Sequence, residues 1–326
     1  MHAAVMRQFG PASVLKTEEW PERRRQPGWS RVRLKAAALN WHDVLVRRGV
    51  YSFVRLPHIP GADGAGITDD GTEVVVLPSI GWGTDERVPG PEFEILGDHR
   101  PGTYAEVTHV PTECLFPKPK GWDWASAAGL SLVGVTAHRA LFGRGRLRPG
   151  ESVLLLGAGG GLSVMAVMLA AAVGSTVFVT SSSPTKLERA RSLGAAGGVL
   201  YTEPDWPQAA RAASPGGIGF DLVIDPVGCW ADSLAALRPG GRCVVLGAKG
   251  TPDQQLDARR FYFGQFDLLG TTMGSRADMV ALLKLVDEGV LRPPPVDHQY
   301  PLDQVVAAHT VMESGEAFGK IVLNVG

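Results

Sequence analysis

Residues 152–174 constrain the fold more than any other stretch of the chain. The apolar segment Val153–Leu156 predicts a short buried strand, and a helix is predicted over Leu162–Val173. Between them lies a glycine cluster, the turn that a dinucleotide pyrophosphate needs, because glycine admits the phosphates and the helix N-terminus attracts them. The motif's third glycine is replaced by leucine, so the loop alone is a weak signal. The candidate cofactor-binding residues here are Gly157, Gly159, Gly160, Gly161 and Leu162.

The same stretch has a competing interpretation as a membrane span. No residue from Ser152 to Val179 is charged, and an uncharged run of this length is typical of a transmembrane helix. However, clusters of glycine and alanine interrupt the run, and it ends in a second strand, Thr176–Thr180. Strand, helix and strand within about 30 residues favour a buried βαβ crossover in a parallel sheet.

The end of this second strand indicates which dinucleotide would bind. Loops that bind NAD place an acidic residue there to hold the ribose hydroxyls, but residues 180–186 read Thr-Ser-Ser-Ser-Pro-Thr-Lys. A ribose phosphate would be repelled by an acid and favoured by hydroxyls and an ammonium group. The sequence therefore predicts NADP(H), held by Ser181, Ser182 and Lys186. A structural alternative is that the serine before Pro184 only caps the following helix.

Charge and composition exclude several classes of partner. The 326 residues carry a formal net charge of −1, which gives no field for nucleic acid or an anionic membrane. Cys114, Cys229 and Cys243 are far apart and form no CxxC pair, as expected in a reducing compartment. Residues 1–7 lack the apolar core of a signal peptide. We therefore expect a cytoplasmic protein that acts on a small molecule and binds neither nucleic acid nor membrane.

The first part of the chain has a β-rich pattern. Residues 1–120 contain short alternating strands punctuated by glycine and proline, which is typical of a partly open β-barrel. One helix, Asn40–Arg48, interrupts the strands. Asn40 suits its N-cap, Asp43 stands where a capping box places an acid, and Gly49 suits the left-handed position after its end.

From residue 121 to 294 strands alternate with helices. Six strands are predicted, starting near residues 153, 176, 198, 220, 241 and 266. This alternation predicts a doubly wound parallel sheet, whose ligands bind at the carboxyl ends of the strands. Residues 295–326 change pattern again and are expected to rejoin the first domain. The fold class is therefore α/β, with residues 1–120 and 295–326 in a substrate domain and 121–294 in a nucleotide-binding domain.

Several motifs, taken in order, resemble one known family. They are Ala37–Asp43, Pro57–Gly66, Gly102–Glu106, Leu130–Ala137, the glycine loop, Asp225–Gly228 and Ser314–Val322. Over nearly the whole chain they resemble the zinc-free, quinone-oxidoreductase-like branch of the medium-chain dehydrogenases/reductases. The resemblance implies a GroES-like, partly open β-barrel catalytic domain and a doubly wound Rossmann domain that binds NADP(H). It also implies a homodimer formed through the edge strand Phe266–Leu269.

Zinc-binding members of this family carry metal ligands that the chain lacks. Asn40 stands where they have a cysteine, Gly61-Ala62-Asp63 where they have Gly-His-Glu, and no cysteine lies near Ser131-Leu132. Their structural zinc lobe corresponds to residues 79–99, which contain no cysteine. Zinc takes Cys, His or carboxylate ligands, so we expect no metal. An alternative metal site would use the side chains of His42, Asp43, Asp63 and His99.

Without a metal to polarise a carbonyl, the expected chemistry is hydride delivery from NADPH to an acceptor that is already polarised. Quinones and α,β-unsaturated carbonyls fit, because the developing charge delocalises onto an oxygen that the protein can hydrogen-bond and protonate. By resemblance, Tyr51 stands where related reductases have an active-site tyrosine and His42 stands at a proton-relay position, while Asn40 could bond a substrate oxygen. Each also has a structural alternative. Tyr51 could be a wall residue between domains, His42 a structural histidine whose hydrogen bonds are satisfied, and Asn40 a helix cap.

The resemblance also implies further cofactor contacts. Thr136 would lie on the nicotinamide side and Tyr201 near the adenosine end, while Gly228, Gly247 and Ala248 would lie in turns that follow strands. Two other functions stay open. One is an enoyl-thioester reductase, for which the basic patch would be Arg144, Arg146 and Arg148. The other is an NADPH-binding sensor with little turnover.

Overall fold

The computed structural model describes residues 1–248 and 253–326. Contacts between Cα atoms divide the chain into two compact units. The first unit contains Met1–Val135 and Gly274–Gly326, and the second contains Thr136–Met273. The chain therefore leaves the first unit after Val135 and returns to it at Gly274.

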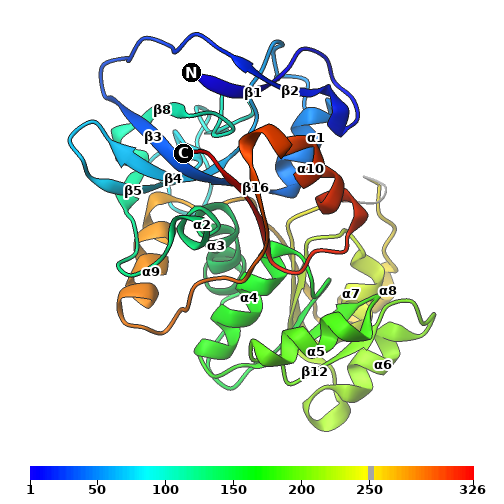
Figure 1. The fold of residues 1–326 in the computed structure, drawn as a ribbon. Coiled ribbons are helices and arrows are strands. Elements are labelled where there is room, and N and C mark those ends of the chain that lie inside the picture. The colour runs from blue at the N-terminus through cyan, green and yellow to red at the C-terminus, as the bar shows by residue number, and fades with distance from the viewer. Residues whose placement is uncertain (249–252) are drawn as a thin grey trace. The chain divides into compact units, whose positions relative to one another are not determined.

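The first unit is built around an open, curved sheet of seven strands (Figure 1). Its order is β16-β17-β3-β4-β5-β9, with β8 paired to β3, and β16 with β17 is its parallel pair. The strands are β3 (Trp29–Ala38), β4 (Asp63–Thr68), β5 (Glu73–Val76), β8 (Val107–Pro111), β9 (Leu115–Pro117), β16 (Val296–Pro301) and β17 (Lys320–Asn324). Because β17 pairs antiparallel with β3, the C-terminal residues complete the sheet that the N-terminal residues begin.

The first unit also contains smaller elements. Two hairpins are formed by β1 (His2–Met6) with β2 (Leu15–Glu19) and by β6 (Ser79–Ile80) with β7 (Glu94–Ile95). The helices are α1 (Trp41–Arg47), α2 (Trp124–Ala128), α3 (Ser131–His138, whose residues from Thr136 on belong to the second unit), α9 (Arg276–Asp287) and α10 (Val305–Ser314), and the 3-10 turns are η1 (Ala12–Val14), η2 (Thr112–Cys114) and η5 (Leu302–Gln304). Apolar side chains from β1, β17 and α10 form one buried cluster. Removing this apolar surface from water is the main force that holds the unit together.

Helix α1 forms where the capping signals predict it. The backbone N–H of Asn40 donates to Oδ2 of Asp43 at 2.8 Å, as in a capping box. Gly49, which follows the helix, has φ of +75°, a conformation that an L side chain rarely adopts. Asn40 and Gly49 thus occupy the predicted positions before and after the helix, and the Asp43 side chain supplies the hydrogen bond at its start.

The second unit is a six-stranded parallel sheet in the order β12-β11-β10-β13-β14-β15. Its strands are β10 (Ser152–Leu155), β11 (Thr176–Ser181), β12 (Gly197–Leu200), β13 (Phe220–Asp225), β14 (Leu237–Val245) and β15 (Asp267–Gly270). In chain order this arrangement is 3-2-1-4-5-6, the order of dinucleotide-binding sheets. The predicted doubly wound sheet is therefore confirmed.

Helices pack against the strands of this sheet (Figure 1). They are α4 (Gly161–Ala172), α5 (Pro184–Ser192), α6 (Trp206–Ala213), α7 (Trp230–Ala236) and α8 (Ala258–Gly264), with a π-helical turn at Arg139–Arg144 and a 3-10 turn at Pro215–Gly217. The predicted helix over Leu162–Val173 thus begins and ends one residue earlier. The uncharged stretch is a buried strand and helix of this sheet, and among the described residues no helix is long and apolar enough to cross a membrane.

The compact units differ from the predicted domain boundary at 121–294. Residues 121–135 and 274–294 belong to the first unit. The physical reason is packing, because α2 contacts β3 and β4, and the Cβ position of Gly134 in α3 lies 2.5 Å from Leu282 of α9. The change of sequence pattern near residue 121 marks where helices begin, whereas the boundary at residue 135 marks where side-chain contacts change partner.

Candidate active site

The glycine loop follows β10 and is anchored to the end of β11. The N–H of Gly157 donates to Oγ1 of Thr180 at 3.0 Å, and the N–H of Ala158 donates to the Thr180 carbonyl at 2.7 Å. Gly157 has φ of +85°, and a Cβ atom built on Gly157 or on Gly160 meets no atom within 4 Å. Space beside this backbone, at the N-terminus of α4, is what the phosphates of a dinucleotide require.

Two other candidate turns meet at the same edge of the sheet. The buried carboxylate of Asp225, at the end of β13, accepts hydrogen bonds from the backbone N–H groups of Val227, Gly228 and Cys229 at 2.7–2.8 Å. A Cβ atom on Gly228 would lie 3.1 Å from Cα of Ala248, and one on Gly247 would lie 2.2 Å from the Pro226 carbonyl oxygen. The structure therefore brings Gly228, Gly247 and Ala248 together, and only glycine fits at Gly247.

The residues after β11 and β12 also meet. Tyr201 follows β12, is half exposed, and donates from its backbone N–H to the Ser181 carbonyl at 2.9 Å. The Ser181 hydroxyl is buried and accepts from the N–H of Ser183 at 3.1 Å, so this hydroxyl supports the backbone turn. Ser182 is exposed and Lys186 is partly exposed in the first turn of α5. Ser183 occupies the predicted N-cap position, without a hydrogen bond from its side chain.

Two candidate cofactor residues lie on helices. Leu162 is partly buried in the first turn of α4, beside the glycine loop. Thr136 is buried in α3, and its hydroxyl lies 3.9 Å from Sδ of Met273. Met273 has φ of +45°, which is unusual for a residue that is not glycine.

In the first unit, Asn40 belongs to a buried polar network. Its Nδ2 donates to Oδ2 of Asp63 at 3.0 Å, and its Oδ1 accepts from Nζ of Lys320 at 2.8 Å. Lys320 also donates to Asp63 at 3.1 Å and to the Leu39 carbonyl at 2.9 Å, while the N–H of Leu132 donates to Oδ1 of Asp63 at 2.7 Å. Both polar ends of the Asn40 side chain are therefore engaged within the protein.

His42 is held between two carboxylates. Its Nε2 lies 3.4 Å from Oδ2 of Asp98, and its Nδ1 lies 3.7 Å from Oδ1 of Asp43. Both ring nitrogens are buried and neither makes a hydrogen bond to a described residue. Burial disfavours the charged ring, but attraction to the two carboxylates outweighs it and raises the pKa of His42 to about 9. His42 is therefore an imidazolium at neutral pH.

Tyr51 lies next to this charged ring. The ring centroids of His42 and Tyr51 are 5.5 Å apart, and Tyr51 stacks on Phe53 at 5.4 Å. Burial, together with the charges of Asp98 and Asp43, raises the pKa of Tyr51. Its hydroxyl is therefore protonated at neutral pH, half-buried, and without a hydrogen bond to any residue that the structure describes.

The residues at the zinc positions do not suit zinc. Asn40, Ala62 and Leu132 offer neither thiolate nor imidazole. The Lys320 ammonium lies between Asn40 and Asp63, so the carboxylate already has a cation. In the described parts of the chain, no three His, Cys, Asp or Glu side chains are grouped to hold a metal. The alternative metal site, which would use His42, Asp43, Asp63 and His99, is not assembled. Asp63 is paired with Lys320, and His99 is paired with Asp98 at 2.7 Å.

The β6–β7 lobe, at the place of the structural zinc in zinc-binding members, is held by other means. The N–H of Gly90 donates to the Trp82 carbonyl at 2.7 Å, and the rings of Trp82 and Phe93 meet edge to face at 5.4 Å. Trp82 is buried. Aromatic packing and backbone hydrogen bonds therefore close this lobe.

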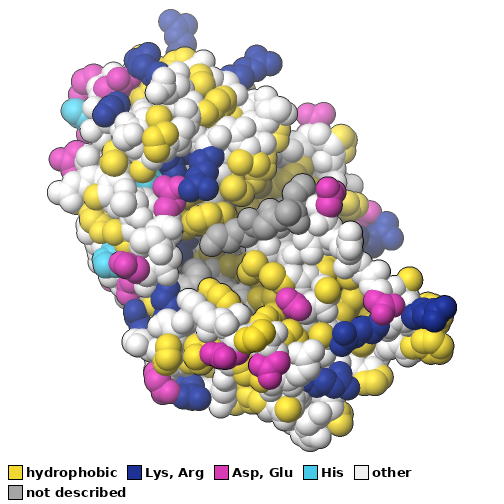
Figure 2. All heavy atoms as spheres, turned by 90° about the vertical axis from the view of Figure 1, so that its right-hand side faces the viewer, with side chains coloured by type: hydrophobic (Ala, Val, Ile, Leu, Met, Phe, Trp, Pro, Cys, Tyr) yellow, Lys and Arg dark blue, Asp and Glu magenta, His cyan; other side chains and the backbone are white. Residues whose placement is uncertain are grey.

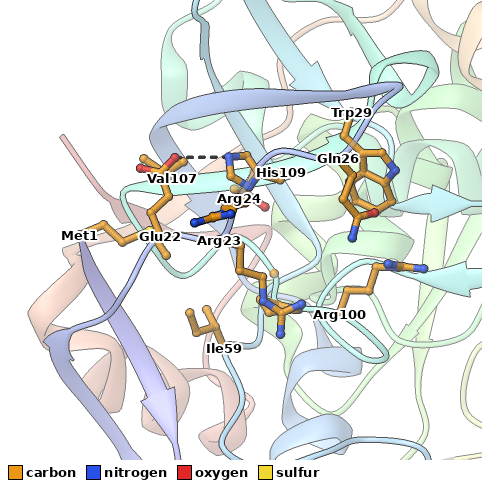
Figure 3. Close-up of a pocket in the computed structure, with 13 residues that line it drawn as sticks. Met1, Glu22, Arg23, Arg24, Gln26, Trp29, Ile59, Arg100, Val107 and His109 are labelled. Atoms are coloured by element: carbon orange, nitrogen blue, oxygen red, sulfur yellow. Dashed lines mark ion pairs between the residues drawn. The ribbon is translucent and has the colours of Figure 1, made fainter.

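A separate small pocket of about 50 Å³ lies in the first unit (Figure 3). Arg100, whose guanidinium lies 4.9 Å from the Trp29 ring centroid, and the His109–Glu22 ion pair line it. None of the candidate catalytic residues lines this pocket. Acidic and basic side chains are interspersed over the face shown in Figure 2, in keeping with the formal net charge of −1.

A dinucleotide-binding sheet with its glycine loop, joined to an open β-barrel unit, defines a two-domain oxidoreductase fold. The family model described as zinc-binding dehydrogenase matches residues 161–288, and the model described as alcohol dehydrogenase GroES-like domain matches residues 26–120. The chain belongs to the medium-chain dehydrogenase/reductase superfamily of oxidoreductases. The superfamily that the motifs indicate is thereby confirmed, as is the combination of a GroES-like domain with a Rossmann domain.

Individual relatives cover nearly the whole chain. A zinc-type alcohol dehydrogenase-like protein of Schizosaccharomyces pombe is 32% identical in an alignment of 335 positions that covers 95% of each chain. A 2-haloacrylate reductase of Burkholderia is 31% identical in an alignment of 337 positions that covers 98% of each chain. A crystal structure described as an NAD-dependent alcohol dehydrogenase is 39% identical, with a TM-score of 0.94 over the full length of both chains.

Proposed function

We propose that the protein is an NADPH-dependent reductase that delivers hydride to quinones or α,β-unsaturated carbonyls without zinc. The observation that carries this proposal is the Lys320 ammonium bound to Asn40 and Asp63. A fixed positive charge beside the one carboxylate at the zinc positions repels a divalent cation. An enzyme without a Lewis acid needs an acceptor whose own conjugation takes up the developing negative charge.

Tyr51 is the proposed proton donor. NADPH, when bound, supplies the hydride. Hydride addition to the β-carbon of an enone leaves an enolate on the acceptor. The Tyr51 hydroxyl hydrogen-bonds the enolate oxygen and transfers its proton to it, which leaves a Tyr51 phenolate and an enol that tautomerises to the saturated carbonyl. The elevated pKa of Tyr51 keeps that proton in place, and the His42 imidazolium lies beside the phenolate that results. Asn40 and His42 then act indirectly, because their polar atoms are engaged or buried.

NADP(H) is the proposed cofactor. Ser182, which is exposed, and Lys186, which is partly exposed, follow β11, and residues 180–186 contain no acid that would repel a ribose phosphate. The related structure described as NAD-dependent argues for the other dinucleotide. The glycine loop suits the pyrophosphate of either, so the choice depends on the ribose end.

The relatives bear on the acceptor. The Burkholderia relative is a 2-haloacrylate reductase, and a haloacrylate is a conjugated acid, which supports a conjugated acceptor for this chain. The enoyl-thioester alternative would use Arg144, Arg146 and Arg148 as a basic patch. Arg144 Nε instead donates to the Gly270 carbonyl at 2.9 Å, and Arg146 pairs with Asp267 at 3.0 Å. Arg144 is thus hydrogen-bonded to the backbone of β15, and Arg146 is ion-paired with its first residue.

The test is oxidation of NADPH and of NADH with 9,10-phenanthrenequinone, a simple enone and crotonyl-CoA, each with and without a chelator. We expect turnover with NADPH that the chelator does not change. Loss of activity on chelation would contradict zinc independence, and faster turnover with NADH would contradict the cofactor assignment. Preference for crotonyl-CoA would favour the enoyl-thioester alternative, and binding of NADPH without turnover would favour a sensor.

A further inference from the structure

Asp98 lies in a tight turn that the surrounding backbone holds rigidly. The turn joins Leu96 to Arg100, and Gly97 in it has φ of +87°. A Cβ atom on Gly97 would lie 2.4 Å from the Gly61 carbonyl oxygen, so the two backbones are in close contact. Nε2 of His58 lies 2.8 Å from the Gly97 carbonyl oxygen. The position of the Asp98 side chain is therefore set by non-local packing.

The carboxylate of Asp98 joins two histidines. Its Oδ2 lies 3.4 Å from Nε2 of His42, and its Oδ1 lies 2.7 Å from Nδ1 of His99. Only 2% of the residue is exposed. Burial alone would raise the pKa of Asp98, but the two histidines outweigh it and lower that pKa. Asp98 is therefore a carboxylate wherever the fold is intact at neutral pH.

The two histidines are also the ends of a row of aromatic rings. His42 contacts Tyr51 at 5.5 Å, Tyr51 stacks on Phe53 at 5.4 Å, and Phe53 stacks on His99 at 3.9 Å. The interplanar angles of the two stacked pairs are 11° and 9°. With Asp98, these residues form a closed ring of contacts that begins and ends at one carboxylate.

Tyr51 needs such a support, because its own backbone lies outside every helix and strand. We infer that Asp98 is a positioning residue of this active site: by holding His42 and His99 it fixes the rings on both sides of Tyr51 and so orients the Tyr51 hydroxyl. The inference rests on the proposed function, in which Tyr51 donates the proton. Asp98 itself touches neither acceptor nor cofactor in this scheme.

The test compares Asp98→Asn with the unmodified enzyme in NADPH-dependent quinone reduction. We expect kcat to fall between about tenfold and 100-fold, because a displaced donor loses alignment, while KM for NADPH stays unchanged. The alkaline limb of the pH profile should move to lower pH, because a charge that raises the pKa of Tyr51 is removed. Among the other titratable groups, the His42 ring contacts Tyr51, the Asp43 charge raises the pKa of Tyr51, and His99 lies beyond Phe53.

A matched control is Asp278→Asn. Asp278 is also a buried carboxylate of the first unit, but it caps α9 through Ser275. We expect this variant to lower stability without moving the pH profile. Equal changes in both variants would overturn the inference, because they would show a general loss of structure. Asp98→Glu, which keeps the charge, should restore the position of the alkaline limb more than it restores kcat.

Readouts that do not need turnover separate this inference from the proposed function. In histidine-ring NMR, Asp98→Asn should move the signals of both His42 and His99, and the Tyr51 pKa, taken as the ultraviolet titration difference from Tyr51→Phe, should fall. If Asp98→Asn does not fold, His99→Phe keeps the ring stack and removes one anchor, and a smaller loss of kcat is expected. Activity lost in Tyr51→Phe but unchanged in Asp98→Asn would overturn the inference alone. Full activity in Tyr51→Phe would contradict the proposed donor instead.

Discussion

The Nζ atom of Lys320 lies 3.1 Å from Oδ2 of Asp63, and both side chains are almost completely buried. The ion pair joins the first residue of β17 to the first residue of β4, strands that each pair with β3. Asn40 and the Leu132 N–H satisfy the remaining polar atoms of the pair. A buried pair whose hydrogen bonds are all made depends strongly on each partner.

Removing one partner of this pair should be costly. We expect Lys320→Met to lower the free energy of unfolding by about 3–5 kcal/mol, because Asp63 would be left as an unpaired buried charge. Urea denaturation followed by circular dichroism measures the change. Lys284→Met is the control, because its pair with Glu288 on α9 is largely exposed and worth under about 1 kcal/mol. A Lys320→Met variant as stable as the control would show that Asp63 is neutral in the fold.

His42 should make stability fall on the alkaline side. Its pKa is about 9 in the folded protein against an ordinary value of 6.5. The folded state holds this proton more tightly than the unfolded chain does. The stabilisation that protonated His42 adds to the folded state is therefore complete below pH 6.5 and is lost as pH rises through 9. In His42→Gln the fall in unfolding free energy between pH 6.5 and 9 should be smaller than in the unmodified protein. If the unfolding free energy of both proteins changed equally with pH, this would contradict the placement of His42 between the carboxylates of Asp43 and Asp98.

His309 should make the free energy of unfolding fall at acidic pH instead. It is fully buried in α10, with neither ring nitrogen bonded to a described residue, and burial lowers its pKa to about 4. The unfolded chain then binds a proton more readily, so stability is lost as pH falls from 6.5 toward 4. We expect His309→Leu to remove part of this acid sensitivity in urea titrations at several pH values. An unchanged acid slope would mean that the histidine is hydrated in solution.

The glycine loop permits a variant that separates binding from folding. Gly160 has ordinary φ of −69°, and its Cβ position meets no atom within 4 Å. Gly160→Val should therefore fold normally, while its side chain fills the space proposed for the pyrophosphate and weakens NADPH binding roughly tenfold or more. Isothermal calorimetry measures the affinity, with Gly270→Ala in β15, also in open space, as the control. Equal affinity in both variants would place the phosphates elsewhere.

The preference between NADPH and NADH should depend on the charge of residue 182. We expect Ser182→Asp to lower kcat/KM for NADPH and raise the NADH/NADPH ratio, because a carboxylate after β11 repels the ribose phosphate and binds ribose hydroxyls. Ser182→Asn is the matched control, since it has nearly the same shape without the charge. The measurement is the ratio of kcat/KM for the two dinucleotides. A ratio that is the same in both variants would argue that residue 182 does not face the ribose.

Local signals in the sequence were sufficient for the second unit. The apolar runs of β10 and β11, the glycine turn and the uncharged α4 carry a short-range pattern, because a parallel strand is buried on both faces and its crossover is compact. The capping box and Gly49 determined α1 in the same way. The strands β1 and β4 were not predicted, because the pairing that makes them strands is non-local.

The sequence by itself determined the fold class, the glycine loop, the missing zinc ligands and the candidates Tyr51, Asn40 and His42. Only the tertiary structure decided what surrounds them. Lys320 reaches Asn40 from 280 residues away, and Asp98 reaches His42 from a turn that no local motif marks. Burial makes these contacts decisive for protonation. In an environment that solvates ions poorly, a nearby charge strongly shifts the pKa of a buried side chain. The order of residues along the chain does not show how close such side chains come in the folded protein.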